Sequence, residues 1–285
     1  MKTRHFVLFL IVLLSFSGQA FAHPHLLRLA DRKVIAFEEM LDDLKTAEVV
    51  LIGELHNHAG HHQAQLAVIR ALHEAGLDIA VGLEMFRADQ QKELHRWSAG
   101  ELDEETFLPI YKENWSMWPL YREIFVGTRD AGIPLIGLNT SRELTKQVAS
   151  HGLASLPDEA RESLGPIPCV VDPDYMQFIR QAMGGHGGMG TSFLYFCEAQ
   201  LLWDVVMARN LTDYRREHPG RRMVVLAGSG HSWKHGIPSR LTEGDPSYRV
   251  ILPEMPGRLD RRSARVEDAD YLWLDEGEGS WTSGY

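Results

Sequence analysis

The stretch "EVVLIGELHNHAGHHQAQLAVIRALHEAG", residues 48–76, decides the fold class of this sequence. Residues 48–53 are mostly apolar and β-branched, which predicts a buried strand. Residues 59–75 carry apolar side chains at helical spacing and stop before Gly76, which predicts a helix that ends at a glycine. A buried strand followed closely by a helix is the repeating unit of a parallel α/β sheet.

The same alternation continues along the chain of 285 residues. Further strands are expected over residues 78–83, 133–138, 223–227 and 248–252, and further helices over residues 89–98, 118–131, 141–150 and 191–217. The sequence therefore predicts an α/β fold with a mostly parallel central sheet and helices on both of its faces. Between about residues 153 and 222, prolines and the glycine-rich "MGGHGGMG" interrupt the alternation, so we expect a helical insertion or lid there.

The first 22 residues have the features of a signal peptide. A basic start precedes an apolar core over residues 6–16, and "AFA" at residues 20–22 is a small-x-small cleavage site. We expect cleavage before His23, which leaves residues 23–285 as a single domain in the periplasm; the alternative is an uncleaved anchor helix. No cysteine lies near the cleavage site, so a lipid anchor at that point is not expected.

Charge and cysteine content narrow the class of protein. Without Lys2 and Arg4, the 29 basic side chains become 27 against 39 acidic ones, so the mature chain has a formal charge of −12. Such a surface repels nucleic acid and anionic lipid, so no nucleic-acid partner is expected. An exported chain folds in an oxidising compartment, where Cys169 and Cys197 form either one disulfide or two buried free thiols.

Polar side chains follow the predicted strands at their carboxyl ends. They are Glu54, His56 and His58 after the first strand, Glu84 after the second, Asn139 after the third, and Ser229 and His231 after the fourth. In an open parallel sheet, ligands bind outside the carboxyl ends of the strands. We therefore expect one site at this edge of the sheet, and we use the term "rim" for Glu54, His56, Glu84 and His231.

Several of these residues also have a simpler interpretation. Glu54 alone can serve to cap the positive end of the following helix. His56 and His58 alternate along the chain, so an extended backbone would point them to opposite sides. We expect His61 and His62 in the first turn of the helix, with at least one of them exposed to solvent.

A metal site is a further alternative for the histidines. His56 and His58, together with His231 or Glu84, are ligand types that zinc accepts. The sequence has no HExxH motif and no Cys-x-x-Cys pair, so ligand type is the only argument for zinc. Glu84 ends a strongly apolar strand, so we expect it to be partly buried and to need a partner.

Five segments together resemble the ChaN-like haem-binding uptake family. They are "LIGELHNHAGHHQAQ", "VGLEMF", "IPLIGLN", "CEAQLLWDVVMA" and "VVLAGSGH". That family belongs to the Tiki/TraB superfamily, which also contains erythromycin-esterase-like enzymes. The resemblance covers about residues 34–253, and the lipobox that some members carry is missing here, so a soluble periplasmic form is expected.

The resemblance implies an α/β fold, haem as the cofactor and a tyrosine as the axial ligand of its iron. It also implies a homodimer around stacked haems and partners among outer-membrane or periplasmic components of haem uptake. The polar residues that the superfamily shares fall on Gly53 and the rim. In the enzymatic branches these positions form a hydrolytic centre, sometimes described as metal-dependent, so catalysis at the rim stays an open question.

The resemblance also points to a tyrosine within the insertion as the haem ligand. Tyr175, in the amphipathic segment "DPDYMQFIRQAM", is our first choice and His186 our second, and Arg180 is placed to pair with a propionate. Tyr195 lies just beyond the same glycine-rich stretch. The alternative is that the apolar residues of this segment belong to the core and that Tyr175 lies on the surface.

Two functions follow from these observations. The first is an exported haem-binding protein for haem or iron uptake that catalyses no reaction. The second is a hydrolase of the protease or esterase-like type, in which the rim activates water with or without a divalent metal. The segment around residues 175–195 separates them, because a haem protein needs it apolar and ligand-bearing.

Overall fold

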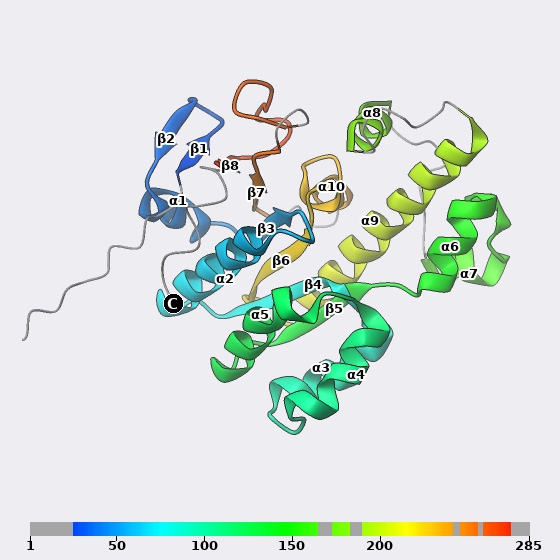
Figure 1. The fold of residues 1–285 in the computed structure, drawn as a ribbon, viewed down its shortest axis with the longest axis horizontal. Helices are drawn as coiled ribbons and strands as arrows, with labels where there is room; N and C mark the ends of the chain where they lie inside the picture. The colour runs from blue at the N-terminus through cyan, green and yellow to red at the C-terminus, as the bar shows by residue number, and fades with distance from the viewer. Residues whose placement is uncertain (1–24, 165–172, 183–189, 242–245, 256–258, 275–285) are drawn as a thin grey trace, which may run out of the picture.

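The computed structural model describes residues 25–164, 173–182, 190–241, 246–255 and 259–274. Within these residues the strands form one eight-stranded sheet in the order β2-β1-β8-β7-β3-β6-β4-β5 (Figure 1). The strands are β1 (Leu26–Arg28), β2 (Lys33–Ile35), β3 (Val49–Glu54), β4 (Ile79–Arg87), β5 (Leu135–Asn139), β6 (Arg222–Gly228), β7 (Tyr248–Pro253) and β8 (Tyr271–Trp273). The strands from β8 to β5 are parallel, whereas β1 is antiparallel to both β2 and β8.

Helices connect most of the strands. The α-helices are α1 (Phe37–Leu44), α2 (Ala59–Glu74), α3 (Gln91–Ser98), α4 (Glu104–Asn114), α5 (Trp118–Asp130), α6 (Arg142–His151), α7 (Asp158–Leu164), α8 (Pro173–Ala182), α9 (Thr191–Glu217) and α10 (Ser229–Ser232). The short 3₁₀ turns are η1 (Ala88–Gln90), η2 (Leu153–Ser155) and η3 (Ile237–Arg240). None of the described helices is both long enough and apolar enough to cross a membrane.

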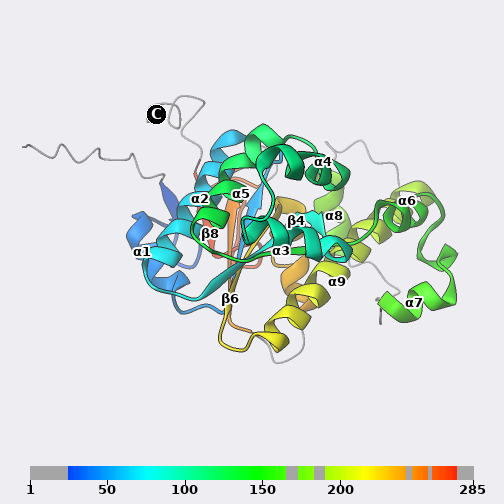
Figure 2. The same ribbon diagram turned by 90° about the horizontal axis from the view of Figure 1, so that it is seen from below.

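The sheet separates two apolar cores. Val50 and Ile52 of β3 face the core beneath α1 to α5, whereas Val49 and Leu51 face the core beneath α8 and α9. This alternation follows from the pleat of a strand, which sends successive side chains to opposite faces. Figure 2 shows α2 and α5 on one side of the sheet and α9 on the other. A strand buried on both faces must be mostly apolar, as β3 is over residues 49–53.

The predicted fold class, a mostly parallel sheet covered on both faces, is confirmed. Each of the five predicted strands is present, with boundaries shifted by a few residues. The predicted glycine stop of α2 is also present, because Gly76 has a left-handed φ of 80° that favours glycine. The described part of residues 153–222 is helical up to β6, and α9 packs along β5 as part of the covering layer.

Candidate functional site

The carboxyl ends of the central strands bring the four rim residues together. Glu54 is the last residue of β3, Glu84 lies in β4, and His231 lies in α10 directly after β6. Because β6 pairs with both β3 and β4, these strands end side by side at one edge of the sheet. His56 follows β3 in a turn, and its ring lies beside Gly228, the last residue of β6.

Glu54 is the centre of a buried hydrogen-bond network. Its carboxylate receives hydrogen bonds from His56 Nδ1 at 2.7 Å, from Gln65 Nε2 at 2.8 Å and from the Tyr121 hydroxyl. His62 Nδ1 lies 3.2 Å from the same carboxylate. Glu54 therefore binds side chains, whereas the N-cap of α2 is His58, which makes no side-chain capping bond.

The protonation of this network follows from its contacts. Burial would raise the pKa of Glu54, but the hydrogen bonds from His56 and His62 outweigh it and hold that pKa well below its usual value. Burial would lower the pKa of His56, but Glu54 outweighs it and the pKa is raised. Glu54 is thus an anion that holds His56 by Nδ1, so Nε2 is the ring atom left for chemistry.

His61 and His62 bind backbone groups in the turn that follows β3. The prediction that His61 or His62 is exposed is wrong, because both are buried. His61 Nδ1 accepts the Leu55 amide at 2.9 Å, and His62 Nε2 lies 3.0 Å from the His56 carbonyl oxygen. The turn after β3 leaves these backbone groups without strand partners, and the two rings turn inward to satisfy them. His58 stacks on His61 with ring centroids 3.9 Å apart.

A second carboxylate and imidazole pair faces the first. His231 Nδ1 lies 2.6 Å from Asp204 Oδ1, and the Tyr175 hydroxyl donates to Asp204 Oδ2 at 2.6 Å. Asp204 is fully buried on α9. Burial would lower the pKa of His231, but the charges of Asp204 and Glu84 outweigh it and raise that pKa to about 9. His231 is therefore protonated at neutral pH.

Glu84 lies between the two histidines. Its Oε2 accepts the Gly228 amide at 2.6 Å, and its Oε1 lies 3.7 Å from His231 Nε2, too far for a hydrogen bond. Three polar atoms thus make no hydrogen bond to any described residue, namely His56 Nε2, His231 Nε2 and Glu84 Oε1. Such a set can take up and release protons at a bound molecule or a water.

Two further predicted site residues support the rim through its backbone. Asn139 Nδ2 donates to the Glu84 carbonyl oxygen at 2.7 Å, and Ser229 Oγ donates to the Glu54 carbonyl oxygen at 3.0 Å. A Cβ on Gly228 would lie 2.9 Å from His56 Cε1, so any larger residue there would require the His56 ring to move. No cluster of three or more metal-ligand side chains occurs among the described residues, so the structure gives the zinc alternative no support.

Four residues of the rim network were not predicted as site residues, although His62 was expected in the first turn of the helix. They are Gln65, Tyr121, His62 and Asp204. Asp204 carries a signal in retrospect, because it is the one charged side chain in the apolar run "LLWDVVMA". A buried charge in such a run requires a partner, and His231 is that partner.

The residues predicted to bind haem lie in different environments. Tyr175 lies in the core with its ring 6.2 Å from that of Trp233, and Arg180 lies over the Phe193 ring at 5.2 Å. Tyr195 is half-buried at the start of α9. His186 lies outside the described residues, as do the glycines on either side of it.

The cysteine alternatives stay open. Cys197 lies on the buried side of α9 and forms no disulfide with a described residue. Burial raises the pKa of its thiol to about 11, so the thiol is neutral at pH 7. Cys169 lies outside the described residues, so the predicted pairing remains a prediction.

Comparisons with known proteins place this fold. It is similar to the structure of cofacial heme binding to ChaN of Campylobacter jejuni, with 21% identity, a TM-score of 0.69, and coverage of 88% of this chain and 96% of that chain. It is also similar to the type III effector HopBA1, with 15% identity, a TM-score of 0.51, and coverage of 83% of this chain and 91% of that chain. A third structure, the erythromycin esterase mutant EreC H289N in its open conformation, shares 17% identity with this chain and gives a TM-score of 0.49. The match covers 81% of this chain and 76% of that chain.

The family comparison goes further than the fold. No curated protein matches the sequence. The family described as "Haem-binding uptake, Tiki superfamily, ChaN" matches residues 40–241, which include the whole rim and all of α9. The resemblance stated from the sequence motifs is therefore confirmed, and this chain belongs to the ChaN family of haem-binding uptake proteins in the Tiki superfamily.

Proposed function

We propose that this protein binds haem and takes part in haem or iron uptake. The observation that carries the proposal is the family match over residues 40–241, which is most of the chain. The similarity of fold to ChaN of Campylobacter jejuni, whose structure is described as binding haem cofacially, is consistent with it. Bound ferric haem would supply an iron that takes an axial ligand from a side chain.

Tyr175 does not fit as that ligand in the arrangement described. Its hydroxyl is committed to Asp204 at 2.6 Å, and the side chain is buried in the core. Burial also raises its pKa well above the usual value, which opposes the phenolate that iron prefers. Tyr175 can serve as a ligand only after its hydrogen bond to Asp204 is broken and α8 has moved.

Tyr195 has a hydroxyl oxygen that is available as an axial ligand to haem iron. It is half-buried, and its hydroxyl makes no hydrogen bond to a described residue. The exposed, apolar Leu194 precedes it in α9, and the ring of Tyr195 lies beside Gly152. In this proposal Tyr195 holds the iron, Arg180 pairs with a propionate, and Tyr175 and His186 are the competing ligands.

Spectroscopic titration with ferric haemin separates these ligands. We expect a saturable Soret band for the wild type and for Tyr175→Phe, and a shifted or weakened band for Tyr195→Phe. If Tyr175→Phe alone abolishes the ferric spectrum, Tyr175 is the ligand and α8 moves on binding. If His186→Ala alone abolishes it, the imidazole is the ligand. A wild type without a saturable band contradicts haem binding itself.

Export and assembly are part of the same proposal. We propose that the mature chain begins at His23 and is soluble in the periplasm, where haem joins two copies and uptake components receive it. The support is the order of basic, apolar and small residues over residues 1–22. N-terminal sequencing after osmotic shock tests the first part, and the molar mass with and without haemin tests the second.

The rim supports a second candidate function, hydrolysis. The observation that favours it is the convergence of His56 Nε2, His231 Nε2 and Glu84 Oε1, none of which is hydrogen-bonded to a described residue. In such a reaction Glu84 accepts a proton from water, the hydroxide attacks a carbonyl carbon, and protonated His231 donates to the leaving group. Turnover of a p-nitrophenyl ester by the wild type, lost in Glu84→Gln, would establish it. Equal rates in the two proteins would contradict it.

A further inference from the structure

Asp204 joins His231 of the rim to a tyrosine of α8. Its Oδ1 accepts a hydrogen bond from His231 Nδ1 and its Oδ2 accepts the Tyr175 hydroxyl, each at 2.6 Å. Asp204 and Tyr175 are both buried, and no other described side chain donates to this carboxylate. A carboxylate that is held at both oxygens cannot turn without breaking a hydrogen bond, so the tyrosine fixes the direction in which His231 is held.

The same arrangement recurs on the opposite face of the sheet. The Glu54 carboxylate receives a hydrogen bond from His56 Nδ1 at 2.7 Å and another from the Tyr121 hydroxyl. Tyr121 belongs to the core beneath α1 to α5, whereas Tyr175 belongs to the core beneath α8 and α9. Two separate segments of the chain thus supply the same order of groups, a tyrosine, a carboxylate and an imidazole. A tyrosine that only filled the core would not need to reach the carboxylate behind a rim histidine.

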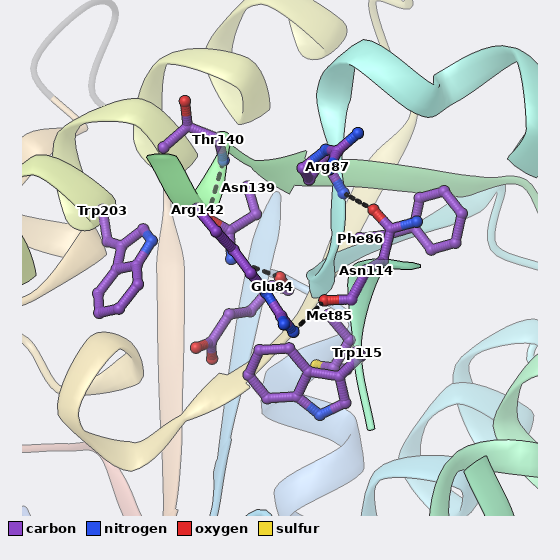
Figure 3. Close-up of a pocket in the computed structure, with 10 residues that line it drawn as sticks. All are labelled: Glu84, Met85, Phe86, Arg87, Asn114, Trp115, Asn139, Thr140, Arg142 and Trp203. Atoms are coloured by element: carbon purple, nitrogen blue, oxygen red, sulfur yellow. Dashed lines mark hydrogen bonds between the residues drawn. The ribbon is translucent and has the colours of Figure 1, made fainter. Parts of the chain in front are cut away.

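The two arrangements meet at Glu84. Its Oε1 lies 3.7 Å from His231 Nε2. The ring of Trp115 meets that of His56 edge-on at 5.1 Å, and the ring of Trp203 meets that of His231 edge-on at 5.8 Å. Figure 3 shows the Glu84 carboxylate projecting toward the space between these two indoles. Because each Nδ1 is bound to its own carboxylate, the two Nε2 atoms are the ring atoms left to act beside Glu84.

The Tyr175 hydroxyl also stabilises the charge of Asp204. Burial raises the pKa of Asp204, and the hydrogen bonds from His231 and Tyr175 act against this rise. Without the hydroxyl, Oδ2 would be a buried charged oxygen with no donor among the described residues, which is costly. The carboxylate would then turn toward its one remaining donor, and the imidazole would lose its fixed direction.

We infer that Tyr175 is a positioning residue of the rim, which acts through Asp204 to hold the His231 ring with Nε2 toward Glu84. Tyr175 therefore serves the rim rather than haem. The position of the His231 ring is a property of the protein without ligand, so it does not depend on haem binding. Only the use of this position in catalysis rests on the second candidate function, hydrolysis at the rim.

NMR of protein with ¹⁵N-labelled histidine tests this role directly. A ring proton that is bound to a buried carboxylate gives a separate low-field signal and exchanges slowly with water. Tyr175→Phe removes only the hydroxyl, so we expect the His231 Nδ1 proton to exchange at least about tenfold faster and that of His56 to stay unchanged. Tyr121→Phe should have the reverse effect. His231→Gln and His56→Gln assign the two signals.

Tyr271→Phe is the matched control. Tyr271 is also buried and donates to an aspartate, Asp43, at 2.7 Å, but that aspartate pairs with Arg249 and not with a histidine. This variant should leave both signals unchanged. The role of Tyr175 is refuted if Tyr175→Phe matches Tyr271→Phe, or if it speeds exchange at both histidines equally. A wild type whose His231 Nδ1 proton exchanges rapidly would refute it without any variant.

Turnover of the p-nitrophenyl ester keeps this role distinct from the hydrolysis proposal. For a wild type that cleaves the ester, we expect Tyr175→Phe to lower kcat at least about tenfold with KM unchanged, and Tyr271→Phe to match the wild type. Equal kcat in Tyr175→Phe and the wild type would contradict the positioning role. A wild type without turnover, in which Tyr175→Phe still speeds exchange at His231, would refute hydrolysis alone.

Discussion

Replacing Asp204 by asparagine should destabilise the protein and discharge His231. The carboxylate of Asp204 is fully buried and accepts two short hydrogen bonds, from Tyr175 and from His231, each at 2.6 Å. An asparagine keeps the shape but offers one acceptor oxygen, and its NH₂ group then faces a donor. Breaking a buried charged pair costs about 3 to 5 kcal/mol, so we expect a loss of about 3 kcal/mol in the free energy of unfolding.

Asp204→Asn should also change the titration of His231. The charge of Asp204 is the main factor that raises the pKa of His231 to about 9 against the effect of burial. Without that charge, the pKa should fall toward its ordinary value of 6.5. The ring proton of His231 can be followed by NMR in labelled protein, with His231→Gln used to assign its signal.

The matched control is Asp213→Asn on the same helix. Asp213 pairs with Arg216 at the surface, so its loss should change the free energy of unfolding by less than about 1 kcal/mol. Urea unfolding measures both variants. If Asp204→Asn is as stable as Asp213→Asn and the pKa of His231 is unchanged, the pairing of Asp204 with His231 is not what charges this histidine.

Three further predictions follow from the same network. His231 binds its proton more tightly in the folded than in the unfolded protein, so protonation of His231 should add about 3 kcal/mol to the free energy of unfolding. This contribution should be complete below pH 6.5 and lost as the pH rises through about 9. Urea unfolding of the wild type and of His231→Gln across this pH range measures the difference. Gly228→Ala should displace the His56 ring, since the new Cβ would lie 2.9 Å from Cε1; an unchanged His56 NMR signal would refute this. Tyr121→Phe should lower the free energy of unfolding by about 1 to 2 kcal/mol, because Glu54 loses a buried hydrogen-bond donor. Urea unfolding measures this loss, and a midpoint equal to that of the wild type would contradict it.

The sequence predicted the parts of the fold that depend on long local patterns. The strand over β3 and the helix over α2 each carry enough apolar residues for their period to be read. The strands β1, β2 and β8 have three residues each and were not predicted, because three residues hold too little of a period-two pattern. Pairing with distant strands is what orders them.

The same limit applies to the site. Glu54, Glu84 and His231 could be predicted because strand ends in a parallel sheet meet at one edge. Asp204 could not be assigned to the site from the sequence. It lies on α9, and packing of α9 on β5 sets which face of this helix points toward the rim. Tyr175 was chosen from an amphipathic segment, but no sequence pattern reveals that its hydroxyl is bound to Asp204.

Ferric haemin titration of the wild type and of Glu84→Gln, followed at the Soret band, tests the central claim most directly. We propose that the chain binds haem, and the proposed ligand Tyr195 places the haem away from the rim. The expected result is a saturable band in both proteins with the same Kd. A wild type that gives no saturable band would contradict haem binding, and a band that is lost in Glu84→Gln would place the haem on the rim itself.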